Sequence, residues 1–273
     1  MKPAVALSIA GSDSGGGAGI QADLKTFAAL GVHGTSAITA ITAQNTVTVT
    51  AIQELPVELI RAQIDAVVGD LAPAAAKTGM LSSPEIIDCV AGAVRDHGLR
   101  QLVVDPVMVA KGGARLLRPD AVEALQAQIL PLAAVLTPNL PEAEVLLGRS
   151  LRTLAEQRQA ARDLQAMGPR AVVVKGGHGE GDQAVDVLFD GEELVELTAG
   201  RLHTPNTHGS GCTFSAAIAA HLALGHSTRQ AVEMAKVFIT AAIRSGLAIG
   251  HGHGPVNPMF DLHRPRLRRP SDP

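Results

Sequence analysis

TPNTHGSGCTFSAAIAAHLA, residues 204–223, joins a glycine-containing turn to a long run of helix-forming residues. Glycines at 209 and 211 permit a positive φ and leave the main chain open to a bound group. The amide groups at the N-terminus of the following helix attract anions. We therefore predict an anion-binding site at the start of this helix, beside Cys212. An ordinary glycine loop before a helix is the alternative, and these residues alone leave it open.

Along the rest of the chain, short apolar runs alternate with helical patterns. Strands that alternate with helices indicate an α/β fold with a mostly parallel central sheet covered on both faces, hence three α/β/α layers. A small β-rich segment is expected near 34–55, as two runs over 34–41 and 46–55 separated by residues 42–45. The other predicted strands cover 4–10, 74–80, 102–104, 133–136 and 171–174, with a hairpin over 185–189 and 193–198; the predicted helices cover 18–30, 56–68, 83–97, 119–130, 141–147, 153–167, 212–224 and 228–245.

Length and composition favour one domain. The 273 residues are 46% hydrophobic, which is enough for a sizeable core. Because no linker long enough to divide the chain is evident, a single domain is expected over 1–262. Residues 263–273 are rich in arginine and proline and are expected to form a basic, flexible tail.

Charge and cysteine content exclude several classes of protein. The net charge is −3 and both signs are interspersed, so we expect neither a nucleic-acid partner nor a membrane surface. Two cysteines cannot form a disulfide framework, and no apolar run is long enough for a membrane helix. The first residues lack the features of a signal peptide. Together these features predict a cytoplasmic location.

Glycine-rich and polar segments follow several of the predicted strands. In a parallel sheet the binding site lies where strands end and helices begin, so these segments are expected to share one edge of the sheet. The chain has no Gly-Lys pair and therefore no Walker A loop, and Ile20 and Ala22 occupy the third-glycine positions of a dinucleotide motif. The segments are 11–17, 105, 139–142, 175–178 and 204–212.

Ordered blocks of sequence carry a family resemblance. They are SIAGSDSGGGAGIQAD (8–23), ITAQNT (41–46), KTGML (77–81), DPVMVAKGG (105–113), TPNLPEAE (137–144), VKGGH (174–178) and THGSGCT (207–213). They resemble, from about residue 4 to the segment near 258, the bacterial hydroxymethylpyrimidine/phosphomethylpyrimidine kinases of the ribokinase-like superfamily.

This resemblance implies a ribokinase-like fold and a reaction that uses ATP and Mg²⁺. The expected substrates are 4-amino-5-hydroxymethyl-2-methylpyrimidine and then its monophosphate, which together supply the pyrimidine half of thiamine. Two alternatives remain: a pyridoxal kinase of the same superfamily, and a pyrimidine-binding regulator without turnover. The resemblance also implies a homodimer built partly on the segment near 34–55.

The resemblance further implies which residues handle the phosphates. The backbone amides of Gly209, Ser210, Gly211 and Cys212 are expected to hold the transferred phosphoryl group, with Lys175 as a cation in contact with phosphate. Asn139 and Glu142 match the NxxE motif of the superfamily, whose carboxylate organises Mg²⁺. Their spacing also fits a helix cap followed by a first-turn acid. Asp105 is expected to organise metal or phosphate, with a plain turn residue before Pro106 as the alternative.

On the substrate side, Gln44 is expected to select the ring, because an amide offers both a donor and an acceptor to an aminopyrimidine edge. Asp23 is expected to receive the 4-amino group, although an acid of the first helix that only favours the helix dipole would look the same. Gly11 is placed at the same site. Met80 and Val107 are expected as apolar walls, with ordinary core packing as their alternative.

Cys212 occupies the position where many ribokinase-like sugar kinases carry an aspartate as base. The pyrimidine kinases resemble this chain in having cysteine there. A helix N-terminus lowers the pKa of a thiol, which would favour a partly ionised Cys212. The hypothesis is that Cys212 acts as a modest base or as a group that only shapes and hydrogen-bonds the acceptor.

Overall fold

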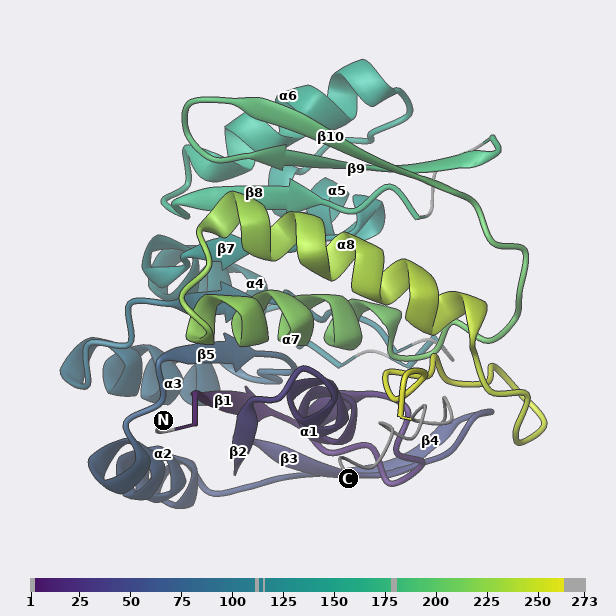
Figure 1. Ribbon diagram of the computed structural model, residues 1–273. Coiled ribbons are helices and arrows are strands. Elements are labelled where there is room, and N and C mark those ends of the chain that lie inside the picture. The colour runs from purple at the N-terminus through teal and green to yellow at the C-terminus, as the bar shows by residue number, and fades with distance from the viewer. Residues whose placement is uncertain (1–2, 111–112, 115, 178–180, 263–273) are drawn as a thin grey trace, which may run out of the picture.

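Eight strands form the central sheet in the computed structural model, which describes residues 3–110, 113–114, 116–177 and 181–262 (Figure 1). The strand order is β10-β9-β8-β7-β6-β5-β1-β2, and every neighbouring pair is parallel except the two pairs made by β9. The expected tail over 263–273 lies outside the described residues. The strands are β1 (Val5–Ala10), β2 (His33–Ile38), β5 (Ala75–Thr78), β6 (Leu102–Val104), β7 (Val135–Leu136), β8 (Ala171–Val174), β9 (Gln183–Phe189) and β10 (Leu194–Gly200).

Helices cover both faces of this sheet. Side chains alternate along each strand, so on β6 Val103 faces one helical layer while Leu102 and Val104 face the other. The three-layer α/β/α arrangement expected from the sequence is thereby confirmed. One layer holds α1 (Gly19–Ala29), α7 (Ser210–Ala223) and α8 (Thr228–Arg244); the other holds α2 (Val57–Leu71), α3 (Pro84–Asp96), α4 (Ala121–Ala124), α5 (Leu140–Leu147) and α6 (Leu154–Gln165).

Helix α7 is the most deeply buried helix of the first layer. Every residue from Thr213 to Leu222 is buried, because α7 packs against the sheet and lies between α1 and α8 (Figure 1). A helix without a polar face is stable only in such a position. Its N-terminus is consequently held at the edge of the sheet where β1, β5, β6 and β8 end.

The small β-rich segment exists, but its predicted division was wrong. The run over 34–41 breaks at Thr39, so that β2 joins the main sheet while β3 (Ala40–Gln44) pairs antiparallel with β4 (Val49–Glu54) in a separate ribbon. Thr39 is held at the break because its hydroxyl donates to the Met80 carbonyl, 2.8 Å away. The chain then reverses at Asn45, whose side-chain oxygen accepts from the amides of two following residues.

Most helix boundaries lie within two residues of those predicted, and two helices differ by more. The helix expected over 56–68 continues to Leu71, and the one expected over 119–130 begins at Ala121 and changes to a π-helical turn over Leu125–Ile129 and a 3₁₀ turn over Leu130–Leu132. Pro131 has no amide hydrogen to continue the α-helical ladder.

Among the described residues, no helix has both the length and the apolar character needed to cross a bilayer.

Candidate active site

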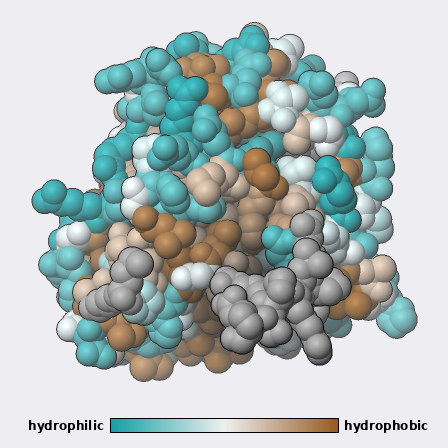
Figure 2. Space-filling model, in the orientation of Figure 1, coloured by the Kyte–Doolittle hydropathy of each residue, from teal (hydrophilic) through white to brown (hydrophobic). Residues whose placement is uncertain are grey.

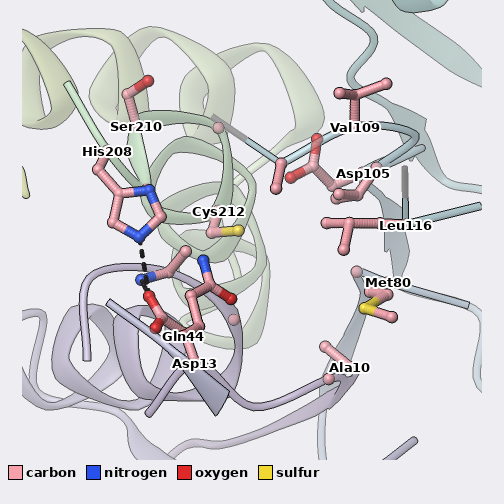
Figure 3. Close-up of a pocket in the computed structure, with 18 of the residues that line it drawn as sticks. Ala10, Asp13, Gln44, Met80, Asp105, Val109, Leu116, His208, Ser210 and Cys212 are labelled. Carbon is pink, nitrogen blue, oxygen red and sulfur yellow. Dashed lines mark hydrogen bonds and ion pairs between the residues drawn. The ribbon is translucent and has the colours of Figure 1, made fainter. Parts of the chain in front are cut away.

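A cavity of about 640 Å³ opens at the edge of the sheet where the parallel strands end. Successive strands each contribute to its wall: β1 through the loop that carries Gly11, β5 through Met80, β6 through Asp105 and β8 through Lys175. The start of α7 closes one side, as Figure 3 shows with Ser210 and Cys212. The shared edge expected from the sequence is therefore present.

Glycine is required where α7 begins. Gly209 is the N-cap residue with φ of 76°, and no side chain caps the first turn. A Cβ atom on Gly209 would lie 1.8 Å from the Gly17 carbonyl oxygen, so no other residue fits there. A Cβ on Gly211 would lie 3.3 Å from Nζ of Lys175 and 3.5 Å from Oδ2 of Asp105. Helix N-terminus, ammonium and carboxylate thus converge on one point.

Lys175 is held between two carboxylates. Its Nζ donates to Oδ1 of Asp105 at 3.0 Å and lies 4.0 Å from Oε2 of Glu142. Burial works against the ammonium, but the charges of Asp105 and Glu142 outweigh it and raise the pKa of Lys175, so the side chain is a fixed cation at neutral pH. Burial raises the pKa of Glu142 to about 7, against the opposing charge of Lys175 and with a further increase from Asp105.

Asn139 and Glu142 form a capping box at the start of α5. The Asn139 side chain accepts from the Glu142 amide at 2.9 Å, and Oε2 of Glu142 accepts from the Asn139 amide at 2.8 Å. The helix-cap alternative raised by the sequence is therefore observed. Both residues also line the large cavity, and the capped Glu142 carboxylate lies 4.0 Å from Nζ of Lys175, so the cap does not remove them from the site.

The donor set fits a magnesium ion that arrives with phosphates. Mg²⁺ is usually bound by one or two carboxylates together with phosphate oxygens and water. Asp105 and Glu142 supply two carboxylates next to the point where α7 begins. Within the described part of the chain, no group of three or more His, Cys, Asp or Glu side chains could hold a metal by itself.

A second cavity, of about 260 Å³, lies on the other side of the same point. It extends along α7 and α8, where Phe214 of α7 and Ile239 and Ile243 of α8 line it. The two cavities share five lining residues, namely Asn139, Lys175, Thr207, Ser210 and Gly211. A molecule in either cavity can therefore reach the amides at the start of α7.

The expectation of a partly ionised Cys212 is not supported. The thiol lines the large cavity (Figure 3), yet burial raises its pKa to about 11. The Lys77 ammonium lowers the pKa, but nearby carboxylates of Asp23 and Asp105 raise it further. The helix N-terminus does not compensate for lost hydration, and the thiol is protonated at neutral pH.

Four of the expected substrate residues line the large cavity: Gly11, Gln44, Met80 and Val107. Gln44 projects from the end of β3, and its side-chain oxygen accepts from the Thr42 hydroxyl at 3.2 Å. A Cβ atom on Gly11 would lie 3.1 Å from Sδ of Met80, so a side chain there would crowd the apolar wall. The structure thus brings these residues together on the side away from the second cavity.

The expected contact between Asp23 and a ring amino group is wrong. Asp23 is 0% exposed and does not line the cavity. Its carboxylate accepts from Nζ of Lys77 at 2.9 and 3.0 Å and from the Ser8 hydroxyl at 2.6 Å, so it is fully occupied beneath the cavity floor. Helical spacing places Asp23 on the same face as Ile20 and Phe27, but it could not show that Lys77, 54 residues away, would occupy the carboxylate.

Lys77 and the Asp13–His208 pair are cavity residues that sequence reasoning missed. Lys77 lies in the buried strand β5, where a charge must have a partner, and that requirement was a usable signal. The attraction of Asp23 outweighs burial and raises the pKa of Lys77. Asp13 and His208 are 195 residues apart and meet only in the fold, with Nε2 of His208 2.8 Å from Oδ2 of Asp13.

Comparison with known proteins agrees with this geometry. A family model described as phosphomethylpyrimidine kinase matches residues 13–257. The chain belongs to that family. A relative in Rhizobium meliloti (strain 1021), a hydroxymethylpyrimidine/phosphomethylpyrimidine kinase, is 56% identical over 257 residues, which are 93% of this chain and 96% of the relative.

Solved structures of family relatives share the fold. An ADP complex of pyridoxal kinase from Bacillus subtilis has a TM-score of 0.90 at 41% identity and covers 96% of this chain and 100% of that chain. A phosphomethylpyrimidine kinase from Clostridium difficile 630 has a TM-score of 0.79 at 44% identity, with 88% and 99% covered. The ribokinase-like fold expected from the sequence is thereby confirmed.

Proposed function

We propose that the protein is an ATP- and Mg²⁺-dependent kinase that phosphorylates 4-amino-5-hydroxymethyl-2-methylpyrimidine and then the resulting monophosphate, in thiamine biosynthesis. One observation carries the proposal: two cavities meet at the start of α7, beside Lys175. Phosphoryl transfer needs this arrangement, because acceptor and nucleotide approach the transferred group from opposite sides, roughly in line.

The large cavity is suited to the pyrimidine. Its walls include the apolar side chains of Met80 and Val107, against which a flat ring can lie. Gln44 offers an amide with both donor and acceptor groups to the aminopyrimidine edge. The ring's hydroxymethyl group would then point toward α7 and Cys212.

We place the nucleotide in the smaller cavity. Phe214, Ile239 and Ile243 supply apolar contact for the base, and the phosphates would extend to Lys175 and the amides of residues 209–212. Each well-placed amide donor stabilises the charge of the transition state by roughly 3 kcal/mol, by analogy with oxyanion holes. A bound ADP in the relative from Bacillus subtilis supports a nucleotide site in this fold.

Asp105 and Glu142 are proposed to hold the magnesium ion, and Asn139 to position Glu142 through the capping box. When bound, Mg²⁺ would neutralise charge on the phosphates. Glu142 gains most from a second cation, because burial and the nearby Asp105 make its ionised form costly.

Phosphoryl transfer requires little help from a general base. The hydroxymethyl oxygen forms a bond to the γ-phosphorus, the bond from that phosphorus to the β,γ-bridging oxygen breaks so that ADP leaves with the electron pair, and the hydroxyl proton passes to solvent. Because the transition state is loose, the proton can leave late. A protonated Cys212 is therefore proposed to hydrogen-bond the acceptor and shape its position, not to ionise it beforehand.

Steady-state assays with ATP and Mg²⁺ test the proposal, with ADP release as readout and either the hydroxymethylpyrimidine or pyridoxal as acceptor. We expect the larger kcat/KM for the pyrimidine. Pyridoxal remains the second candidate substrate because the Bacillus subtilis structure with a TM-score of 0.90 is a pyridoxal kinase. Tight pyrimidine binding without ADP release would instead indicate a regulator.

We also propose a homodimer in the cytoplasm. Three apolar side chains in this region are exposed: Ile41 of β3 by 50%, Ile52 of β4 by 40% and Leu59 of α2 by 49%. Figure 2 shows hydrophobic side chains near α2 and β3, in the lower part of the view. Ile41 pairs with Gln53 and Ile52 with Thr42, so the two isoleucines lie on opposite faces of the ribbon. Exposed apolar side chains on both faces suit an interface in which a second chain encloses the ribbon. Two unpaired thiols, Cys89 and Cys212, suit a reducing compartment.

A further inference from the structure

We propose that Asp13 and His208 form a positioning pair. The pair fixes the loop between β1 and α1, which borders the large cavity, against the start of α7, where the phosphoryl group is proposed to bind. This inference rests on the proposed function, since it assigns the pair to the transfer step. The two side chains meet at the boundary between these segments, as the dashed line in Figure 3 shows. Both border the large cavity, and they act through the backbone that they hold.

Asp13 organises the loop between β1 and α1. Its Oδ1 accepts from the Gly15 amide at 2.8 Å, and its Oδ2 accepts from the amides of Gly17 at 3.1 Å and Ala18 at 2.8 Å. The residue is 2% exposed. Burial favours the neutral acid, but the hydrogen bonds from His208 and the loop amides outweigh it and lower the pKa of Asp13, so the carboxylate is ionised at neutral pH. The loop is folded around this charge.

His208 holds the other segment. Its Nε2 lies 2.8 Å from Oδ2 of Asp13, its amide donates to the Gly254 carbonyl at 3.1 Å, and its own carbonyl accepts from the Val256 amide at 3.0 Å. The next residue, Gly209, is the N-cap of α7. His208 is thus fixed on both its side chain and its backbone, directly before the amides proposed to bind phosphate.

The two segments are in close backbone contact, with no room for a side chain between them. A Cβ atom on Gly17 would lie 2.4 Å from the His208 ring, and a Cβ on Gly209 would lie 1.8 Å from the Gly17 carbonyl oxygen. Asp13, Gly17, His208 and Gly209 therefore form one backbone-to-backbone junction. Since misplacement of reacting groups by about 1 Å can cost roughly 100-fold in rate, loss of the pair should slow transfer even with both ligands bound.

The GHGHG segment extends this junction to the lip of the cavity. The His253 amide donates to the Thr46 carbonyl at 3.0 Å, close to Gln44 at the end of β3. Gly254, one residue further on, accepts from the His208 amide. The segment thereby connects the rim of the large cavity to His208, which precedes the N-cap of α7. This gives a role to a glycine-rich motif that the phosphate chemistry does not use.

Two substitutions at His208 test the inference in the full-length protein. His208→Phe keeps a planar ring but cannot bond to Asp13, whereas His208→Gln keeps a side-chain N–H donor. We expect kcat for the accepted ring alcohol to fall about 100-fold in His208→Phe, and His208→Gln to recover at least a tenth of native kcat. His33→Phe, on an exposed histidine at the start of β2, is the matched control and should keep native kcat.

The readouts separate positioning from general damage. A positioning role predicts that the KM for ATP stays within about threefold of native while more ADP is released per phosphorylated ring, because the nucleotide side stays intact and water replaces a misplaced acceptor. His208→Phe with native kcat and native coupling would overturn the inference. So would a parallel loss of melting temperature and ATP binding, because that outcome assigns the pair to folding of the whole site. If the native protein phosphorylates no ring alcohol, the proposed function fails first, and it does so independently of any variant.

Discussion

Cys212 shows why a residue type and its position in a helix do not settle its chemistry. The sequence places a thiol at the first turn of α7, where the helix favours the thiolate. The fold also removes water from that thiol and sets it near the carboxylates of Asp23 and Asp105, and burial is the largest of these effects. No local pattern could reveal this balance, because Asp23 is buried by the packing of α1 on the sheet.

The raised pKa of Cys212 predicts slow alkylation at neutral pH. Burial disfavours the charged form, so the reactive thiolate appears only as the pH approaches the value of about 11. In a Cys89→Ala variant, the rate of iodoacetamide labelling should rise about tenfold per pH unit from pH 7 to pH 10. Mass spectrometry of the labelled protein gives the rate at each pH. A rate that levels off below pH 9 would contradict the assigned environment.

At the scale of elements, the start of α7 was predictable and the ribbon was not. Two glycines before an apolar helix give a local signal for an anion site, and Ser83 followed by Pro84 is likewise a local signal for a helix start, where the structure has Ser83 as the N-cap of α3. The separation of β2 from β3 at Thr39 depends on bonds to the Ala10 and Met80 carbonyls, which are distant in sequence. Because β propensity is continuous over 34–41, the sequence predicted one strand there, whereas the structure has parts of β2 and β3, which belong to different sheets.

Two glycine-to-alanine changes, one at the N-cap of α7 and one inside α3, should have opposite effects on the free energy of unfolding. Gly209→Ala places a Cβ at positive φ and against the Gly17 carbonyl, so we expect a loss of about 2 kcal/mol in unfolding free energy and a fall in kcat of about 100-fold or more. Gly92→Ala, inside α3 with nothing within 4 Å, should gain up to about 1 kcal/mol and keep native kcat. Urea unfolding and steady-state assays measure both. Native stability and turnover in Gly209→Ala would refute the constraint.

For the whole molecule, the sequence predicted the layers and the shared edge but not the two cavities. Alternating strands and helices suffice to place Gly11, Asp105 and Lys175 at one edge of a parallel sheet. The cavities depend on how α8 packs on α7 and on how the ribbon lies over Met80, which are long-range contacts without a local signature. For the same reason Asp13 and His208 could not be paired from the sequence.

The exposed apolar side chains of the ribbon predict the state of association. Light scattering at micromolar concentration should give twice the 28.1 kDa mass of one chain. Ile41→Glu should shift the protein toward the mass of one chain, because it places a charge in the proposed interface. Val237→Glu, at a residue of α8 that is 72% exposed, is the control and should leave the dimer intact. A single-chain mass for the native protein would rule out the proposed dimer.

In the proposed reaction, one site transfers a phosphoryl group to the pyrimidine twice in succession. The most direct measurement is ³¹P NMR of a single sample that contains the protein, Mg²⁺, excess ATP and a limiting amount of 4-amino-5-hydroxymethyl-2-methylpyrimidine. We expect a monoester signal that rises and then falls, a diphosphate pair that replaces it, and two ADP for each pyrimidine consumed. If no phosphorylated pyrimidine forms while the protein is folded and ATP is present, the protein is not a kinase of this pyrimidine.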